Sequence, residues 1–266
     1  MIVCADDFGM AESIDQAVLE LVARGKLTAV SCAVSHPACR ADSIKALLAH
    51  AAKMDVGLHL VLTDEGKPLA DSPTGSLCNG DGFYKFGPLL CRSWLRRLNR
   101  EEIKVEIAAQ YDRFNTLAGR RPDFIDGHLH VHQFPVIREA VLDFICEVPR
   151  TERPYVRNTR MSPAQIIRTG PSLPKNILIG RPGSAFRRKA LRRGLATNTG
   201  FAGIYNYAPG SEFSTLFGTF LASLRLPNDI LVVHPGAEPW RKREYDALLN
   251  WNPGPLMPNR FVWNRK

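Results

Sequence analysis

The 266-residue chain has no apolar run of about 18 residues or more, so no membrane-spanning helix is expected. Its six cysteines form no CxxC pair, which argues against a zinc ribbon or a thioredoxin-type motif. The first residues show neither the basic start nor the cleavage site of a signal peptide. We therefore expect a cytoplasmic protein with reduced thiols. Without internal repeats or low-complexity linkers, the chain is interpreted as one domain spanning residues 1–266.

Positive charge is abundant, and the net charge is +9. Much of it lies in three clusters, at Arg92–Arg100, Arg187–Arg193 and Arg241–Arg243. We interpret them as solvated helix faces; a patch for an anionic substrate or for peripheral contact with a membrane is the alternative. No nucleic-acid-binding motif accompanies the charge, so no nucleic-acid partner is expected. On a helix predicted over Ala185–Leu195, the spacing places Phe186, Ala190 and Leu191 inward and the arginines outward.

Short apolar runs alternate with amphipathic stretches along the chain. Strands are predicted over Ile2–Ala5, Thr28–Val34, Val56–Leu60, Pro122–Asp126, Tyr155–Arg157 and Ile230–His234. Helices are predicted over Ile14–Ala23, Ser43–Ala52, Glu101–Leu117, Val136–Cys146, Ala185–Leu195, Phe213–Leu224 and Arg243–Leu249. Residues 62–98, rich in Gly, Pro, Asp and Ser, are interpreted as a loop excursion near the site. The alternation predicts an α/β fold with a mainly parallel sheet, as in a closed or partly open β/α barrel.

The residues that carry chemistry stand at the ends of predicted strands. Asp6 and Asp7 follow the first strand, His59 closes the third, and His234 ends the last long one. In a β/α barrel the loops after the strands form the active-site face. These side chains are therefore expected to converge on one mouth.

Asp6 and Asp7 are adjacent carboxylates. Gly9 follows them and permits a turn that lets both face the mouth. Two carboxylates this close repel each other unless a cation lies between them, or unless one acts while the other binds. The alternative is that one of the two caps the following helix.

Three of the seven histidines fall within five residues, in Asp126-Gly-His-Leu-His-Val-His132. In an extended strand, His128, His130 and His132 share one face. Histidine is the commonest metal ligand, and packing alone does not readily explain three alternating ones. Not all three need be metal ligands: one can hydrogen-bond the substrate, and another can support the metal ligands from a place beside Asp126.

His59 and His234 complete the set. A lone histidine in an apolar strand is usually a satisfied core residue, but His59 stands at a strand end. With Asp7 and His128 it gives three protein ligands and leaves room for water, as in a catalytic metal site. The strand delivers His234 to the mouth, and we interpret it as a general acid because histidine titrates near neutral pH. A core or capping role is the alternative for His234.

Four motifs resemble, in order, those of the YdjC-like (ChbG/HpnK) carbohydrate deacetylases. They are Ala5-Asp-Asp-Phe-Gly9, Val56-Gly-Leu-His-Leu-Val-Leu-Thr63, Asp126-Gly-His-Leu-His-Val-His132 and Val232-Val-His-Pro235. The resemblance runs from residue 1 to roughly residue 240. It departs at Ser35-His-Pro37, at Leu129 and over residues 162–211, so the identity of the sugar stays open.

The resemblance implies a distorted β/α barrel related to the NodB-type polysaccharide deacetylases. It implies removal of an N-acetyl group from an amino sugar, either chitooligosaccharide-like or lipid-linked. It also implies one divalent metal ion with three ligands, Asp7, His59 and His128. By the same resemblance Asp6 is the general base, Arg157 keeps it ionised, and His234 is the general acid.

Several alternatives remain at this stage. One Asp and two His suit zinc, and also magnesium or manganese with more waters. The same set occurs in non-haem iron oxygenases, but these usually carry a His-x-Asp pair, which the chain lacks. Another metal hydrolase, such as a phosphoesterase, predicts a second metal with a ligand from Asp6 or Asp126. A non-catalytic binder of carbohydrates or lipid headgroups predicts a lost catalytic residue, whereas all motif positions are filled. The aromatic side chains of the excursion could stack on sugar rings or simply pack in the protein, and both roles stay open for Phe83, Tyr84, Phe86 and Trp94. Whether the chain forms a homodimer is also left open.

Overall fold

Seven parallel strands form one curled sheet, in the order β7-β6-β3-β2-β1-β9-β8. The strands are β1 (Ile2–Phe8), β2 (Ala29–Cys32), β3 (Asp55–Leu60), β6 (Phe124–Gly127), β7 (Tyr155–Val156), β8 (Phe201–Ala202) and β9 (Ile230–Val233). A bridge from Val156 to Thr197 joins β7 to the segment that leads into β8. The fold is therefore a distorted, half-closed β/α barrel, as the sequence predicted. This computed structural model describes residues 1–64, 66–70, 75–80, 82–162, 173–207, 213–252 and 259–263, with only the backbone of 173–176.

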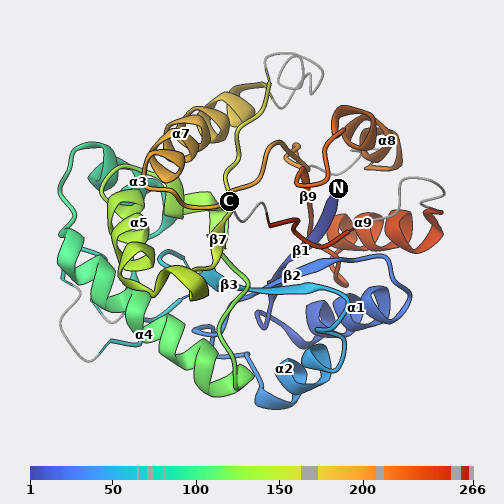
Figure 1. Cartoon of the computed structure of the whole chain (residues 1–266), viewed down its shortest axis with the longest axis horizontal. Coiled ribbons are helices and arrows are strands. Elements are labelled where there is room, and N and C mark those ends of the chain that lie inside the picture. The colour runs from blue at the N-terminus through green and yellow to red at the C-terminus, as the bar shows by residue number, and fades with distance from the viewer. Residues whose placement is uncertain are drawn as a thin grey trace.

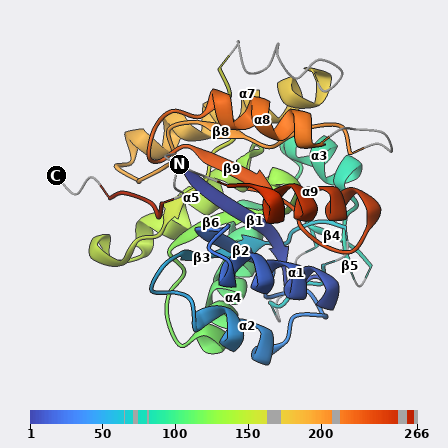
Figure 2. The ribbon, with the colours of Figure 1, turned by 90° about the vertical axis from the view of Figure 1, so that its right-hand side faces the viewer.

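Helices surround the sheet on its outer side (Figure 1). The longer ones are α1 (Glu12–Ala23), α2 (Ala41–Leu48), α4 (Arg100–Ala118), α5 (Ile137–Glu147), α7 (Leu173–Arg192), α8 (Phe213–Ser223) and α9 (Pro239–Asn250). Figure 2 shows α1, α2 and α4 on one side of the strands and α7 and α8 on the other. Among the described residues, no helix is both long and apolar enough to cross a lipid bilayer.

Apolar side chains pack on both faces of the sheet. A large cluster lies between the strands and the helices. A second cluster occupies the inside of the curl, and its strand residues are Ile2, Cys4, Ala29, Phe124, Tyr155, Phe201, Ile230 and Val232. Gly57 belongs to the same inner surface, because a Cβ at this position would lie 2.4 Å from the ring of Phe124. The inside of the barrel is thus a packed core rather than a channel.

The end of the chain closes the base of this inner core. The ring of Phe261 stacks on Tyr155 with 4.0 Å between centroids, and Arg260 Nε donates to Asp55 Oδ1 at 2.8 Å. The described tail residues 259–263 thus lie against the base of the barrel.

Two expectations about the elements need correction. Residues 62–98 are not a plain loop: they contain an antiparallel pair, β4 (Cys78–Asn79) and β5 (Gly82–Phe83), and the helix α3 (Phe86–Trp94). The helix predicted over Ala185–Leu195 is the last part of α7, which begins at Leu173 and continues through Pro182.

The inward face of this helix was predicted correctly at two of three positions. Phe186 and Ala190 are buried, but Leu191 is 47% exposed. The expectation for Leu191 was wrong because Leu191 follows Phe186 by five positions, which turns its side chain about 140° around the helix from that of Phe186. In the parts of 162–211 that the structure describes, the short strand β8 was also not predicted.

Candidate active site

A layer of polar side chains lies directly above the inner apolar core, at the carboxyl ends of the strands. Each stands two residues after an inward-facing position, so strand alternation turns it to the inside as well. The members are Asp6, Ser31, His59, Asp126, Arg157 and His234. The first five are buried, and the His234 side chain is 13% exposed. The sequence prediction that strand ends converge on one mouth therefore agrees with the placement of these residues.

Asp7 reaches the same mouth through a local irregularity. Alternation alone would turn its side chain away from Asp6. The pairing of β1 with β2 shifts register between Ala5 and Phe8, and Asp7 has a left-handed backbone with φ 67°. Gly9, with φ 94°, completes the turn. A strained conformation of this kind costs on the order of 1–3 kcal/mol and is typical of functional sites.

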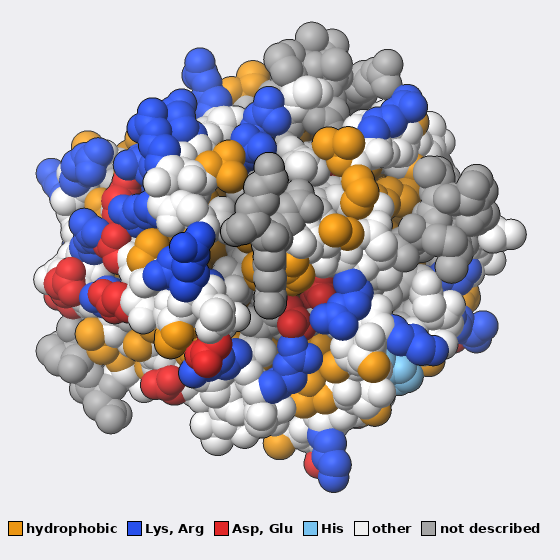
Figure 3. Space-filling model, in the orientation of Figure 1, with side chains coloured by type: hydrophobic (Ala, Val, Ile, Leu, Met, Phe, Trp, Pro, Cys, Tyr) orange, Lys and Arg blue, Asp and Glu red, His pale blue; other side chains and the backbone are white. Residues whose placement is uncertain are grey.

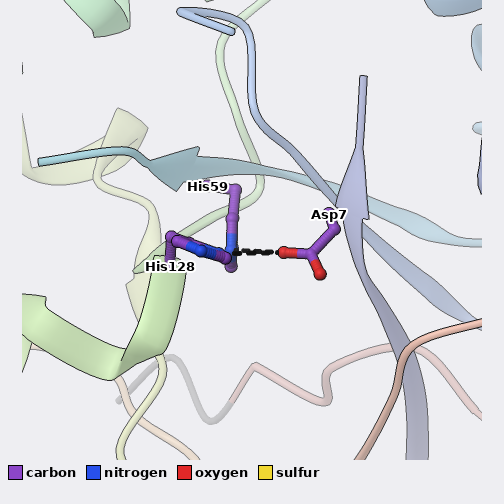
Figure 4. A group of neighbouring side chains, drawn as sticks. All are labelled: Asp7, His59 and His128. Atoms are coloured by element: carbon purple, nitrogen blue, oxygen red, sulfur yellow. Dashed lines mark hydrogen bonds and ion pairs between the residues drawn. The ribbon is translucent and has the colours of Figure 1, made fainter. Parts of the chain in front are cut away.

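Asp7, His59 and His128 face one another at the mouth (Figure 4). Asp7 Oδ1 lies 3.3 Å from His59 Nε2 and 3.1 Å from His128 Nδ1. All three candidate ligand atoms lie within 4.8 Å of one another. The structure thus brings together the three residues that the resemblance marks as metal ligands.

The arrangement fits a divalent cation. Two ligand atoms bound at about 2.1 Å, with an angle of roughly 90–110° at the metal, are about 3.0–3.4 Å apart. His59 Nε2 is buried and makes no well-directed hydrogen bond, although it lies 3.3 Å from Asp7 Oδ1. A buried nitrogen of this kind, facing a carboxylate and a second imidazole, is a ready ligand atom.

Asp126 supports His59 from behind. The Nδ1 atom of His59 lies 2.7 Å from Asp126 Oδ1, and Ser31 Oγ donates to the same oxygen. Burial alone lowers the pKa of His59, but the charge and hydrogen bond of Asp126, together with the nearby carboxylate of Asp7, outweigh it and raise this pKa to about 10. The site therefore strongly favours positive charge between its carboxylates. A carboxylate behind a histidine ligand is a common way to orient the ring and strengthen a metal bond.

Arg241 holds the second oxygen of Asp7. Its Nη2 atom donates to Asp7 Oδ2 at 2.7 Å, and its guanidinium lies over the ring of Trp240, 4.4 Å from the centroid. This contact leaves Asp7 Oδ1 directed at the two histidines. From the sequence, Arg241 was interpreted only as part of a solvated helix face, because it belongs to the basic cluster Arg241–Arg243.

Arg157 is a fully buried cation that joins opposite parts of the sheet. Its Nη1 and Nη2 atoms donate to the two oxygens of Asp6 at 2.6 and 2.7 Å, and Nη1 also lies 3.1 Å from Asp126 Oδ2. Two parallel bonds of this kind fix the carboxylate plane. The pair spans from β7, at one edge of the sheet, to β1, which lies four strands away in the sheet order.

The histidine cluster differs from its prediction. His128–Gln133 form a short 3-10 turn, η1, in which Leu129 and His130 have left-handed φ of 49° and 58°, so the three histidines share no face. His132 Nε2 donates to the carbonyl of Arg157 at 2.9 Å, which fixes the segment that carries Arg157. His130 packs edge-on against Phe201. Only His128 of the three contacts Asp7.

Both remaining histidines are held neutral by burial. Burial, followed by the charge of Arg157, lowers the pKa of His130 well below its ordinary value. Burial lowers the pKa of His132 to about 4, although Asp126 opposes the shift. His132 thus contacts the segment that carries Arg157, and a role for it in binding substrate or in supporting the ligands stays a prediction.

His234 lies beside Asp6 and is held by a residue that the sequence did not reveal. Its Nε2 atom is 4.0 Å from Asp6 Oδ2. The buried carboxylate of Glu244, on α9, accepts the backbone N–H of His234 and the hydroxyl of Tyr205, and it lies 3.8 Å from His234 Nδ1. One signal was available: Glu244 stands four residues before the apolar Leu248, a spacing that places both on one helix face, and both are buried in α9.

Aromatic rings flank the exposed side of His234. Tyr207 lies 5.6 Å and Trp240 lies 5.8 Å from its ring, centroid to centroid, and they contact each other at 4.7 Å. Of the aromatic residues for which sugar stacking or ordinary packing was left open, Phe83 is buried in the outer core, and Phe86 packs against Phe134, just after η1. Tyr207 and Trp240 are therefore an aromatic pair that contacts the polar layer at His234.

Comparison with known proteins places the chain in a family. The family model described as YdjC-like protein matches residues 1–251. The chain belongs to the YdjC-like family. It is 35% identical over 173 residues to a chitooligosaccharide deacetylase of Escherichia fergusonii, covering 62% of this chain and 64% of that relative. It is 36% identical over 143 residues to a carbohydrate deacetylase of Danio rerio, covering 53% of this chain and 44% of that relative. These alignments thus span about half to two thirds of the relatives' lengths.

Solved structures share the YdjC-like chain's architecture. A candidate cellobiose-phosphate cleavage protein from Enterococcus faecalis V583 superposes with a TM-score of 0.68 at 22% identity, covering 93% of this chain and 89% of that one. A peptidoglycan N-acetylglucosamine deacetylase superposes with a TM-score of 0.52 at 11% identity, covering 98% and 84%. At these identities the likeness shows the fold alone, and it agrees with the predicted distorted β/α barrel.

Proposed function

We propose that this YdjC-like protein removes the N-acetyl group from an acetylated amino sugar by metal-dependent hydrolysis. The observation that carries the proposal is the placement of Asp6 and His234 beside the Asp7–His59–His128 cluster. Named relatives that are deacetylases of chitooligosaccharides and carbohydrates support the class of substrate.

Asp7, His59 and His128 would hold one divalent ion, zinc or magnesium, with manganese as a further candidate. When bound, such an ion polarises the acetamide carbonyl and makes water a better nucleophile. The carboxylate behind His59 and the guanidinium behind Asp7 would keep these ligands oriented.

Asp6 is the proposed general base. Arg157 donates to both of its oxygens and so fixes the plane of the carboxylate that would accept a proton from water. His234 is the proposed general acid, which gives a proton to the nitrogen of the leaving amine. The two side chains are 4.0 Å apart, so both reach one reacting centre. Tyr207 and Trp240, beside His234, supply ring faces against which a sugar can pack.

The arrangement argues against a two-metal phosphoesterase. Such an enzyme would use Asp6 or Asp126 as a ligand to a second ion. Cys4, Asp6 and Asp126 do form a second cluster of potential ligands. The guanidinium of Arg157, however, contacts both carboxylates and supplies the positive charge there.

The test is release of acetate from N-acetylated chitooligosaccharides by the purified chain, with and without a chelator. Asp6→Asn should keep the bound metal, because the three ligands remain, and it should lose activity by about a hundredfold to ten-thousandfold. His234→Ala should slow substrates with poor leaving groups more than substrates with good ones. Metal content is measured on the same samples.

Two matched variants serve as controls. Asp112→Asn changes an exposed acid on α4, and His50→Ala changes a histidine outside the polar layer. Both should behave like the unmodified chain. Loss of metal in Asp6→Asn would make Asp6 a ligand and refute its role as base. Equal slowing of good and poor leaving groups in His234→Ala would make His234 a positioning residue.

A further inference from the structure

The middle of the chain is strongly basic. From Arg153 to Ser211 the sequence holds nine arginines and two lysines and no acidic residue. In the rest of the chain acidic residues slightly outnumber basic ones. The net charge of +9 is therefore concentrated in the part of the chain that includes α7. Figure 3 shows basic side chains gathered at the upper left, where Figure 1 places α7.

Four of these arginines surround one pocket of about 550 Å³. Its lining residues are Arg160, Ser184, Arg187, Arg188, Leu191 and Arg192. Arg160 comes from the segment after β7, and the other three arginines come from α7, so two elements build the pocket. Leu191, which is 47% exposed, adds one apolar wall.

These guanidinium groups differ from their neighbours in lacking acidic partners. On the same helix, Lys189 pairs with Glu139 at 3.2 Å and Arg193 pairs with Asp143 at 3.0 Å. Within the described part of the chain, none of the four pocket arginines forms an ion pair. The Nε atom of Arg187 is buried without a hydrogen-bond partner. Burial, followed by the charge of Arg160, lowers the pKa of Arg187. Holding these positive charges close together without acidic partners therefore costs free energy.

The pocket stands on a rigid part of the fold. Gly183 of α7 packs directly on the backbone of Thr159 and Arg160, because a Cβ there would lie 2.7 Å from Thr159 C and 2.9 Å from Arg160 N. Phe186, one residue before Arg187, contacts the ring of His132. Arg160 is three residues after Arg157 in the chain. The arginine pocket therefore has a fixed place next to the segment that carries the proposed catalytic layer, without sharing its residues.

We infer that this pocket binds a phosphate-bearing ligand. A phosphate group carries close to two negative charges near neutral pH and offers several acceptor oxygens. Guanidinium forks match this geometry with paired, charge-assisted hydrogen bonds. The volume exceeds that of one phosphate, so the pocket has room for a pyrophosphate or for the organic group next to the phosphate. The inference does not depend on the proposed acetamide hydrolysis.

The experiment titrates the full chain with inorganic pyrophosphate by calorimetry at low and moderate salt. The double variant Arg188→Gln/Arg192→Gln changes two exposed side chains, so the fold should persist, and thermal unfolding checks this. Its affinity for pyrophosphate should fall about tenfold or more, because each charged hydrogen bond to the anion contributes measurably. Arg160→Gln, from a different segment, should weaken binding as well.

The matched control is Arg96→Gln/Arg97→Gln, which removes the same charge from two exposed arginines outside the pocket. It should bind pyrophosphate like the unmodified chain. Equal weakening in the control would show general attraction by net charge and overturn the inference. Absence of pyrophosphate binding by the unmodified chain would overturn it too, as would an unchanged affinity in both pocket variants.

Vesicles distinguish the source of the phosphate. The unmodified chain and the pocket variants are sedimented with phosphatidylglycerol vesicles and with phosphatidylcholine vesicles. Pocket-dependent binding to the anionic vesicles would assign the phosphate to a lipid headgroup. Pyrophosphate binding without vesicle binding would assign it to a soluble phosphorylated compound.

Discussion

His132 should make the stability of this protein depend on pH in a way that one substitution removes. In the folded chain its pKa is lowered to about 4, because burial disfavours the charged ring. In the unfolded chain the pKa returns to about 6.5. The folded state therefore binds fewer protons than the unfolded state between these values, and stability falls as the pH falls.

The size of the effect follows from the two pKa values. One unit of pKa difference corresponds to about 1.4 kcal/mol, so lowering the pH from about 7 to about 5 should cost about 2 kcal/mol through His132 alone. The complete loss, reached below about pH 4, is about 3 kcal/mol. His130, whose pKa is also lowered by burial, adds to the loss in the same direction.

The assay compares urea unfolding of the unmodified chain and of His132→Gln at both pH values, with chelator present so that metal binding does not contribute. Glutamine retains a donor for the carbonyl of Arg157 and does not titrate. Other titrating groups are common to both proteins. The variant should therefore lose about 2 kcal/mol less than the unmodified chain on acidification. Equal losses would refute a buried, neutral His132.

Three further predictions concern packing and the support of the site. Gly57→Ala should lower the unfolding free energy by about 1–3 kcal/mol, because its Cβ would meet the ring of Phe124 at 2.4 Å. Gly218→Ala, in α8, has no atom within 4 Å of the new Cβ and should raise the unfolding free energy by about 0.5–1 kcal/mol. Urea unfolding compares the two variants. Arg241→Gln should weaken metal affinity about tenfold to a hundredfold, measured by competition with a chelator, and unchanged affinity would dismiss a supporting role for this arginine. Glu244→Gln should lower the unfolding free energy by about 1.5–3 kcal/mol and slow acetate release, because His234, the proposed general acid, loses a charged acceptor for its backbone N–H. A loss of stability without slower turnover would leave Glu244 structural only.

The sequence was most informative where a pattern is local. Apolar runs located β1, β3 and β9, because fully buried parallel strands have continuous apolar character. Strand ends then located Asp6, His59 and His234, because parallel strands deliver their last residues to one edge. The two-residue β8 carried too little pattern to detect.

Features that depend on contacts between distant parts of the chain could not be predicted from local sequence patterns. The alternation of His128, His130 and His132 suggested an extended strand, but left-handed residues turn the chain immediately after β6. Glu244 and Arg241 lie on a helix far along the chain, and only the tertiary structure brings them to His234 and Asp7. The resemblance to a family supplied the roles of Asp6 and Arg157, which the local pattern left open.

The link between Arg157 and Asp6 also has a consequence for the order of synthesis. All candidate metal ligands lie within the first 128 residues, whereas Arg157 and His234 follow later. A growing chain therefore contains the three proposed metal ligands and Asp6 before it contains Arg157 and His234. A product of translation interrupted before residue 157 would lack both of these neighbours of Asp6, so the polar layer is complete only when the later part of the chain has folded onto the first.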